Sequence, residues 1–334
     1  MDARQDPAPA FVDASEAEAG ALAGSTVAVV GYGNLGRSIA LNLWDAGVSV
    51  VVGNIDDPYR ISAHEDGLPA LDIAEATGRA DVVWLLVPDE VMSECYEGSI
   101  AGVLREGSAL CLSSGYALAY DRIKPSPDVD VLMVAPRMLG EQVRRTFQEG
   151  TGFISYLSVE QDASGRARQR VLALADAVGA LRRGAMWLDA RHEAILDLFI
   201  EQTVGAYLGT AIQLAFQLGV EAGIPPEALV LEMYQSGEMS RTFQTFAELG
   251  FMRSAAVHGA VAEFGGFVRT LEVDRAEMER VFRHVLDEIT SPAFADRLQR
   301  ELEEGSPTLR TIEEITSGAD PMTEAELEVR RWIR

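Results

Sequence analysis

Short apolar runs alternate with amphipathic stretches from Ser25 to about residue 185. The apolar runs lie at residues 26–30, 48–52, 81–87, 108–113 and 130–136. Strands that are apolar on both faces are typical of a parallel sheet with helices on both sides. The pattern therefore predicts a doubly wound α/β domain over residues 25–185.

A helical periodicity replaces this alternation after residue 185 and continues to about residue 304, with breaks at residues 223–226 and around Gly265. It predicts an all-helical second domain over residues 186–304. We expect residues 305–334 to form a short acidic C-terminal tail segment, either without regular structure or ending in a helix. Residues 1–24 are rich in Ala, Asp, Glu and Pro and predict a disordered acidic tail.

Composition narrows the class of protein. The chain has 334 residues, of which 48% are hydrophobic, and this is enough for a sizeable core. A formal net charge of -24 repels nucleic acids and anionic membranes. We find neither an apolar run of about 18 residues nor a signal-peptide pattern, so we expect a cytoplasmic enzyme that acts on a small molecule. Cys95 and Cys111 have no metal-ligand spacing, and we expect buried thiols rather than a disulfide.

A glycine motif follows the first apolar run. Gly31, Gly33 and Gly36 form G-x-G-x-x-G directly before an amphipathic stretch. In a dinucleotide-binding turn the first glycine permits the tight turn, the second lets the backbone approach a pyrophosphate, and the third lets helix and strand pack closely. The motif therefore predicts a Rossmann domain that binds NAD(P)H; a purely structural glycine turn is the alternative. The predicted loop contacts are Gly31, Tyr32, Gly33, Asn34, Leu35 and Gly36.

The residues after the second apolar run bear on the choice between NADH and NADPH. Asn54, Asp56 and Asp57 lie there. An acidic group at this place accepts a hydrogen bond from the ribose 2′-hydroxyl and repels a 2′-phosphate, so these candidate contacts favour NADH over NADPH. Two alternatives stay open, namely an ordinary Asp-Asp-Pro turn and a phosphate contact from Arg60.

Three carboxylates recur at spacings of four in an otherwise apolar stretch. If residues 190–202 are helical, Glu193, Asp197 and Glu201 lie along one face. Like charges in a row repel one another, and a divalent cation such as Mg²⁺ would neutralise them. In the alternative, Glu193 and Glu201 lie at the rim of a solvated face and only Asp197 is unusual.

The chain resembles the ketol-acid reductoisomerases of branched-chain amino acid synthesis. The resemblance covers roughly residues 25–330 and rests on GYGNLGRSIALNLWDAGVSVVVG, DVVWLLVPDEV, DVDVLMVAP, QDASGRA, DLFIEQ and EAGIPPEALVLE, which occur in the family's order. It implies a Rossmann domain, a knotted helical domain, NAD(P)H and two Mg²⁺ ions. It also implies a homodimer or higher homo-oligomer with sites shared between subunits. The family first shifts an alkyl group in a 2-aceto-2-hydroxy acid and then reduces the resulting 2-keto acid.

The resemblance assigns roles to particular residues. The family's first two metal carboxylates fall on Asp197 and Glu201, and its third, which comes from a partner subunit, falls on Glu232. Further cofactor contacts fall on Pro88, Asp89, Gly115 and Gly140.

Several positions depart from the family pattern. In the predicted helix 226–239, Ser236 stands where the fourth metal carboxylate is expected; Ser114 replaces the catalytic histidine, and Arg137 replaces a lysine. We expect Arg137 to hold a substrate carboxylate. Ser114 or Tyr116 either relays a proton or only fills the pocket.

These departures predict a diverged reductase. It would reduce a small 2-keto acid or imine with NAD(P)H in a specialised pathway, with one Mg²⁺ rather than two and with isomerisation impaired or lost. The alternatives are an authentic ketol-acid reductoisomerase and a non-catalytic dinucleotide-binding protein.

Overall fold

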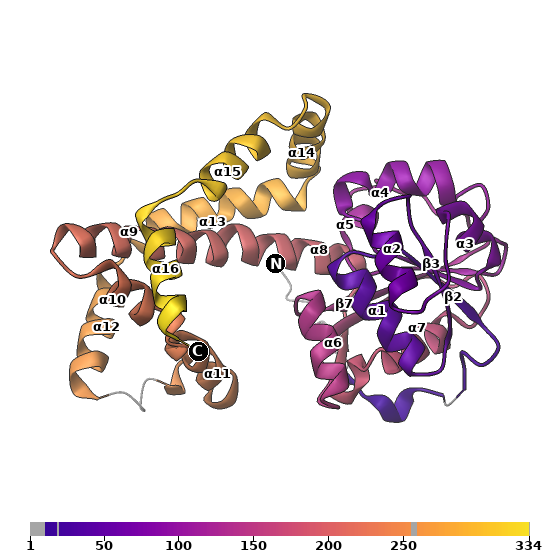
Figure 1. The fold of residues 1–334 in the computed structure, drawn as a ribbon, viewed down its shortest axis with the longest axis horizontal. Coiled ribbons are helices and arrows are strands. Elements are labelled where there is room, and N and C mark those ends of the chain that lie inside the picture. The colour runs from indigo at the N-terminus through magenta and orange to yellow at the C-terminus, as the bar shows by residue number, and fades with distance from the viewer. Residues whose placement is uncertain (1–10, 19, 255–258, 334) are drawn as a thin grey trace, which may run out of the picture. The chain divides into compact units, whose positions relative to one another are not determined.

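The structure, a computed structural model, describes residues 11–18, 20–254 and 259–333. It divides into two units, Met1–Asp197 and Leu198–Arg334. Figure 1 draws the first unit mainly in indigo to magenta, and the second in rose, orange and yellow. Each unit is described by itself below.

A nine-stranded sheet forms the centre of the first unit, and the strand order is β1-β9-β8-β7-β6-β5-β2-β3-β4. All five predicted strands are present. The pairs β7–β8 and β1–β9 are antiparallel and the other neighbouring pairs are parallel. The strands are β1 (Phe11–Val12), β2 (Thr26–Val30), β3 (Ser49–Gly53), β4 (Ala70–Leu71), β5 (Val82–Leu85), β6 (Ala109–Leu112), β7 (Asp130–Pro136), β8 (Ser155–Gln161) and β9 (Ala185–Trp187).

Helices cover both faces of this sheet because alternate strand residues are apolar on each side. Val27 and Val29 of β2 pack with α1 (Asn34–Asp45), α6 (Gly140–Gln148) and α7 (Ala167–Ala177). Ala28 and Val30 pack on the opposite face with α3 (Ile73–Arg79), α4 (Asp89–Cys95) and the π-helical turn η2 (Tyr96–Ile100). The short helices η1 (Ala14–Glu16), α2 (Pro58–Glu65), α5 (Tyr116–Ala119) and η3 (Ala180–Arg182) complete the unit. The predicted doubly wound α/β fold is confirmed.

The strand order places a ligand crevice beside β2. This strand lies between β3 and β5. The sheet continues from it through β3 and β4 on one side and through β5, β6 and β7 on the other, so the strand order reverses at β2. In open α/β sheets such a switch point, at the carboxyl ends of the strands, is where ligands bind. The glycine motif follows β2 at this end of the sheet.

The predicted N-terminal tail is wrong for part of its length. Phe11 and Val12 form β1, which pairs with Met186 and Ala185 at one edge of the sheet, and Val12 is 3% exposed. An open sheet edge offers unpaired N–H and C=O groups, and a two-residue strand can satisfy them without any periodic sequence signal. Residues 1–10 of the predicted tail lie outside the described residues.

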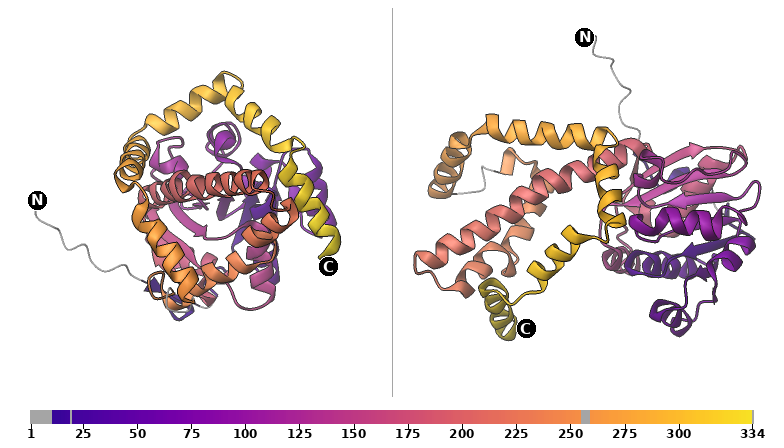
Figure 2. Two further views of the ribbon diagram at one scale, coloured as in Figure 1. Left: turned by 90° about the vertical axis from the view of Figure 1, so that its left-hand side faces the viewer. Right: turned by 90° about the horizontal axis from the view of Figure 1, so that it is seen from above.

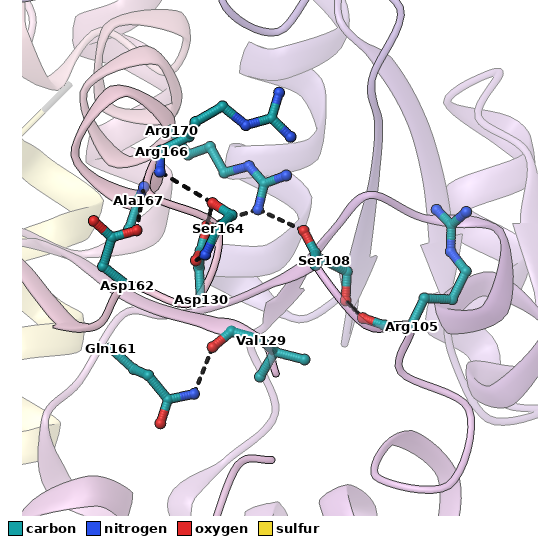
Figure 3. Close-up of polar contacts among 11 residues, drawn as sticks. Arg105, Ser108, Val129, Asp130, Gln161, Asp162, Ser164, Arg166, Ala167 and Arg170 are labelled. Atoms are coloured by element: carbon teal, nitrogen blue, oxygen red, sulfur yellow. Dashed lines mark hydrogen bonds and ion pairs between the residues drawn. The ribbon is translucent and has the colours of Figure 1, made fainter. Parts of the chain in front are cut away.

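A buried acid stabilises the opposite end of the sheet, where the strands begin. Asp130, the first residue of β7, is 0% exposed. Its carboxylate accepts hydrogen bonds from the backbone N–H and the hydroxyl of Ser164 (2.9 and 2.7 Å) and from Arg170 Nη1 (2.7 Å). Arg170 also donates to the Gly107 carbonyl, so the contacts in Figure 3 join the starts of β7 and α7 to the loop before β6.

Within residues 198–254 and 259–333, the second unit consists of helices joined by turns and loops, without strands, as Figure 2 shows. The helix α8 (Ala190–Ile200) enters it, and the π-helical turn η4 (Glu201–Gly205) follows. The remaining helices are α9 (Ala206–Glu221), α10 (Pro226–Val230), η5 (Leu231–Gln235), α11 (Glu238–Leu249), α12 (Ala260–Glu272), α13 (Arg275–Thr290), α14 (Ala293–Glu303), α15 (Pro307–Ser317) and α16 (Pro321–Trp332). The predicted all-helical class is confirmed, whereas the knot stays a prediction.

Two details of the predicted helical region are wrong. Gly265 lies inside α12, although the predicted break at residues 223–226 is present. The described residues of the predicted tail 305–334 are not a tail, because most of them form α15 and α16; the terminal helix that the prediction allowed is α16. Ala325 and Val329 of α16 are buried against Phe216 and Val230. Helix amphipathicity is hard to recognise there because the segment is short and acidic, so its few apolar residues gave no clear period.

Among the residues that the structure describes, one helical stretch meets the length and composition of a membrane span. Ala190–Glu221 has 32 residues and a mean hydropathy of 1.2 over its most apolar window, of which 17% is buried. The prediction that no such run exists considered uninterrupted apolar residues, whereas the mean hydropathy of an 18-residue window can be high even when the window contains a few polar residues. A core helix of a soluble protein passes the same test, so a single helix of this kind is weak evidence.

Candidate functional site

A cavity of 940 Å³ lies at the switch point of the sheet. Eight of the predicted cofactor contacts line it: Gly31, Tyr32, Gly33, Asn34, Leu35, Asn54, Asp57 and Pro88. The predicted contacts Gly36, Asp56, Asp89, Gly115 and Gly140 are not among its lining residues. The cavity is large enough for part of a dinucleotide and is bounded by the N-terminus of α1.

Glycine is needed at each of the three motif positions for a different structural reason. Gly31 has φ +94°, and a Cβ on it would lie 2.7 Å from the Leu86 carbonyl oxygen. A Cβ on Gly36 would lie 1.9 Å from the Gly31 carbonyl oxygen, so α1 can pack on the loop only with glycine at this position. Gly33 has nothing within 4 Å of its Cβ position and so leaves the space open through which a pyrophosphate could approach the backbone.

Asn54 links the glycine loop to the start of α2. Its side-chain oxygen accepts from the Tyr32 backbone N–H at 3.1 Å, and its amide donates to Asp57 Oδ1 at 2.7 Å. The same Asp57 oxygen caps α2 by accepting from the backbone N–H groups of Tyr59 and Arg60. Asp57 therefore serves a helix cap and also faces the cavity, while Asp56 is exposed.

Arg37 of α1 and Arg60 of α2 are not among the lining residues of the cavity, and both contact carboxylates. Arg37 donates to both oxygens of Asp66 (2.6 and 2.8 Å), and the Tyr32 hydroxyl donates to the same acid at 2.8 Å. Arg60 Nη1 donates to Asp72 at 2.6 Å. These pairs lower the positive potential that would attract a 2′-phosphate.

The far wall of the cavity consists of residues that the sequence patterns did not predict. The additional lining residues are Ile55, Tyr59, Ile73, Leu86, Val87, Val91, Glu94, Cys95, Gly98 and Ser99. Cys95, Gly98 and Ser99 lie in or beside the π-helical turn η2, and π-helical turns are frequent at functional sites but have no sequence signature. Cys95 and Cys111 are free thiols, as predicted, but only Cys111 is buried; Cys95 is partly exposed where it lines the cavity.

The glycines that do not line the cavity bring backbones together. A Cβ on Gly140 would lie 2.5 Å from backbone atoms of Asn34, so α6 packs directly on the start of α1. A Cβ on Gly115 would lie 1.9 Å from the Ala190 carbonyl oxygen, so the loop after β6 packs on the start of α8.

A second group of polar residues follows the carboxyl ends of β6 and β7. Arg137 comes directly after β7, and its Nη1 donates to Glu193 Oε1 at 2.7 Å while its Nη2 donates to Asp197 Oδ1. Glu193 Oε2 accepts from the Gly115 N–H at 2.7 Å. Glu193 is 2% exposed, so the alternative of a solvated rim is wrong for this residue.

Arg137 therefore neutralises two members of the predicted carboxylate row. Desolvation acts against its charge, but Asp197 and Glu193 outweigh that effect and raise the pKa of the guanidinium. Desolvation raises the pKa of Glu193 in spite of its hydrogen bonds from Gly115 and Arg137. The predicted substrate contact of Arg137 stays a prediction, because both its Nη atoms donate to carboxylates of the chain.

Three further candidates belong to the same end of the sheet. Desolvation of the Asp89 carboxyl, together with the negative charges of Glu90, Glu193 and Asp197, raises its pKa to about 6, although the residue keeps an exposed surface. Ser114 Oγ accepts from the Tyr116 N–H at 3.2 Å. Burial raises the pKa of the Tyr116 phenol, which therefore keeps its proton at neutral pH.

The other predicted metal ligands belong to the second unit. Glu201 begins the π-helical turn η4 and Glu232 lies in the π-helical turn η5; both are exposed. The predicted helix 226–239 ends at Gln235, because Gly237 adopts the left-handed conformation with φ +80°. Ser236 lies at this break, and its hydroxyl accepts from the Glu238 N–H at 3.3 Å.

The donor chemistry fits a hard cation. Carboxylate oxygens are the ligands that Mg²⁺ prefers, and Glu193 and Asp197 already attract the cationic guanidinium of Arg137. Among the residues that the structure describes, no group of three or more His, Cys, Asp or Glu side chains is placed to hold a metal ion. The three-ligand set Asp197, Glu201 and Glu232 therefore stays a prediction.

Comparison with known proteins covers both units. Residues 21–184 match the family profile described as "Acetohydroxy acid isomeroreductase, NADPH-binding domain", and residues 191–334 match "Ketol-acid reductoisomerase, C-terminal domain". The chain is 36% identical over 299 residues to "Ketol-acid reductoisomerase (NADP(+))" from Akkermansia muciniphila, covering 89% of this chain and 91% of that protein. The solved structure of an NADH-preferring ketol-acid reductoisomerase from an uncultured archean superposes with a TM-score of 0.91 at 32% identity, over 97% of this chain and 99% of that chain.

Proposed function

The chain belongs to the ketol-acid reductoisomerase family, whose members are NAD(P)H-dependent oxidoreductases, and on that premise we propose that it reduces a small 2-keto acid or imine with isomerisation impaired or lost. The cofactor cavity supports the reductive half of this proposal. Its glycine cradle is complete, since Gly31 and Gly36 have no room for a side chain and Gly33 leaves the approach to the backbone open.

We further propose NADH as the preferred cofactor. Asp57 faces the cavity, and Arg37 and Arg60 are each engaged with a carboxylate, so a 2′-phosphate would meet net negative charge. The similarity to an NADH-preferring family member supports the same preference.

We infer the impaired isomerisation from two serines, Ser236 and Ser114, which stand where the family has a carboxylate and a histidine. Alkyl migration requires the substrate's oxygens to be held across two metals and a group that moves a proton. Ser236 stands at the position of the fourth carboxylate, beyond the end of η5, and its hydroxyl accepts from the Glu238 N–H at the start of α11. Ser114 stands at the position of the histidine and accepts from the Tyr116 backbone. Neither hydroxyl supplies the charge or the basicity of the group that it replaces.

The residues would divide the reductive chemistry as follows. When bound, a reduced nicotinamide supplies a hydride and Mg²⁺ supplies Lewis acidity to the substrate's oxygens. Asp197, Glu201 and Glu232 would hold a single cation. The glycine loop and Asn54 would orient the dinucleotide, and Tyr116, which retains its proton, or Ser114 would protonate the oxygen or nitrogen of the reduced product.

We propose that the protein acts as a homodimer or larger homo-oligomer in the cytoplasm, without nucleic-acid or membrane partners. Large apolar side chains of α9 and α12, such as Leu214, Leu218, Val261 and Phe264, are 52–90% exposed in a single chain. Such a surface favours association with a second copy. The net charge of -24 opposes binding to nucleic acids and anionic lipids.

A second candidate function is complete ketol-acid reductoisomerase activity. The TM-score of 0.91 with a family member supports it, because the scaffold that presents both halves of the chemistry is the same.

Oxidation of NADH in the presence of Mg²⁺ and a series of small 2-keto acids and cyclic imines tests the proposed reduction. We expect turnover of at least one compound and a lower KM for NADH than for NADPH. Tight NADH binding without turnover of any compound would instead favour a dinucleotide-binding protein without catalysis.

A further inference from the structure

We propose that Arg137 competes with a divalent cation for Asp197, so that metal binding requires the guanidinium to leave this carboxylate. The inference depends on the proposed function only for the role of Asp197 as a metal ligand. It adds a positioning residue that controls the affinity for the metal.

The contacts of Arg137 support this competition. Its two Nη atoms donate to Glu193 and Asp197, which lie one helical turn apart on α8. A guanidinium presents its donors in a rigid planar fork, which can span two carboxylates at once, whereas the ammonium of a lysine is a compact point charge. Arginine at this position therefore supplies to both acids the positive charge that a metal would otherwise supply.

The contact of Arg137 with Glu193 is held more firmly than its contact with Asp197. Glu193 is 2% exposed and is fixed by the Gly115 N–H, whereas the Asp197 side chain is 40% exposed. The guanidinium also lies over the Tyr156 ring, 5.1 Å from its centroid, and the Arg137 N–H donates to the Ile154 carbonyl at 2.9 Å. The backbone and the Glu193 contact can thus persist while the contact with Asp197 opens.

Arg137 and a metal ion therefore compete for the more exposed carboxylate, Asp197. A guanidinium and a dication near one carboxylate repel each other, and the repulsion is stronger in a partly desolvated site than in water. Binding of the metal at Asp197 therefore weakens the contact of Arg137 with this residue, and by reciprocity Arg137 weakens the binding of the metal.

Binding of Mn²⁺ to the full-length chain, without substrate or cofactor, tests the proposal. The free metal is measured by electron paramagnetic resonance for the wild type, R137Q and R137K, with R105Q as the matched control. Arg105 also donates to a carboxylate, Asp81, but lies before β6, and the control loses the same unit of charge. We expect R137Q to lower the Kd for Mn²⁺ by about tenfold. We expect a smaller decrease for R137K and none for R105Q.

Equal Kd values for wild type, R137Q and R137K, or no binding by any of them, would overturn the competition. If R137Q does not fold, the comparison of R137K with the wild type decides. The double variant R137Q/D197N separates this inference from the proposed function. If it binds Mn²⁺ as tightly as R137Q, Asp197 is not a ligand and the metal assignment fails. If it binds more weakly while wild type and R137Q bind alike, only the competition fails.

Discussion

The backbone N–H of Gly115 donates to Glu193 Oε2 at 2.7 Å, and this bond joins the loop after β6 to the first turn of α8. The other oxygen of Glu193 accepts from Arg137, directly after β7. One buried carboxylate therefore positions the residues after two neighbouring strands, including the three-residue segment Ser114–Tyr116.

Removal of this carboxylate is expected to destabilise the first unit. E193A leaves the Gly115 N–H without its acceptor and removes one of the two carboxylates that Arg137 contacts, and loss of one member of a buried pair costs about 3 kcal/mol of the free energy of unfolding. E193Q can still accept from Gly115 and should cost about 1 kcal/mol. Urea denaturation measures both values. The exposed Glu106 provides the control variant E106A, and a cost for E193A no larger than that of E106A would contradict this role.

Two glycine substitutions should separate packing from cofactor binding. G36A places a Cβ 1.9 Å from the Gly31 carbonyl oxygen, so both the melting temperature and the affinity for NADH should fall. G33A meets no protein atom within 4 Å and should fold normally, yet bind NADH at least about tenfold more weakly because the methyl group occupies the pyrophosphate approach. Calorimetric titration and a thermal melt test the pair. Unchanged NADH affinity in a folded G33A would exclude this loop as the pyrophosphate site.

Asp72 is expected to limit the use of NADPH. Its carboxylate holds Arg60 at 2.6 Å, and the Asp72 side chain is 75% exposed, so the pair contributes about 1 kcal/mol at most. D72N should release Arg60 toward a 2′-phosphate and lower the KM for NADPH by about threefold, with the KM for NADH unchanged. The control is E75Q, which removes an acid from an exposed pair within α3, the helix that Asp72 directly precedes. An equal change in both KM values would show that Arg60 does not read the phosphate.

The contacts of Asp130 should matter for stability alone. D130N leaves Arg170 without its buried anion and should lower the free energy of unfolding by about 3 kcal/mol. Turnover per folded molecule should not change, since Asp130 lies at the end of the sheet opposite the cofactor cavity. D128N, at an exposed acid two residues earlier, is the matched control. A selective loss of turnover in a stable D130N would contradict a purely structural role.

The sequence predicted the elements whose signal is local. Gly31, Gly33 and Gly36 have fixed spacing, and β2 and β7 are continuous apolar runs, so their positions follow from the chain alone. The strand β8, with the sequence SYLSVEQ, was missed because polar residues interrupt it and its pairing with β7 supplies the order that its composition does not.

The contacts of the candidate site depended on the fold. Arg137 and Asp197 are 60 residues apart, and only the packing of α8 near the end of β7 brings their side chains together. The spacing of Glu193 and Asp197 predicted a cation beside them, but not that this cation is an arginine of the same chain. The end of the helix at Gln235 depends on the left-handed Gly237, a conformation that sequence alone does not fix.

The most direct test of the account compares two substrates in one enzyme preparation. NADH oxidation is measured with 2-acetolactate and with 3-hydroxy-3-methyl-2-oxobutyrate, its isomerised form, at saturating Mg²⁺. We expect kcat/KM for the isomerised compound to exceed that for 2-acetolactate by at least about a hundredfold, since loss of a proton-transfer group alone typically costs that factor. Comparable kcat/KM values for the two compounds would contradict it and would establish the chain as a complete ketol-acid reductoisomerase.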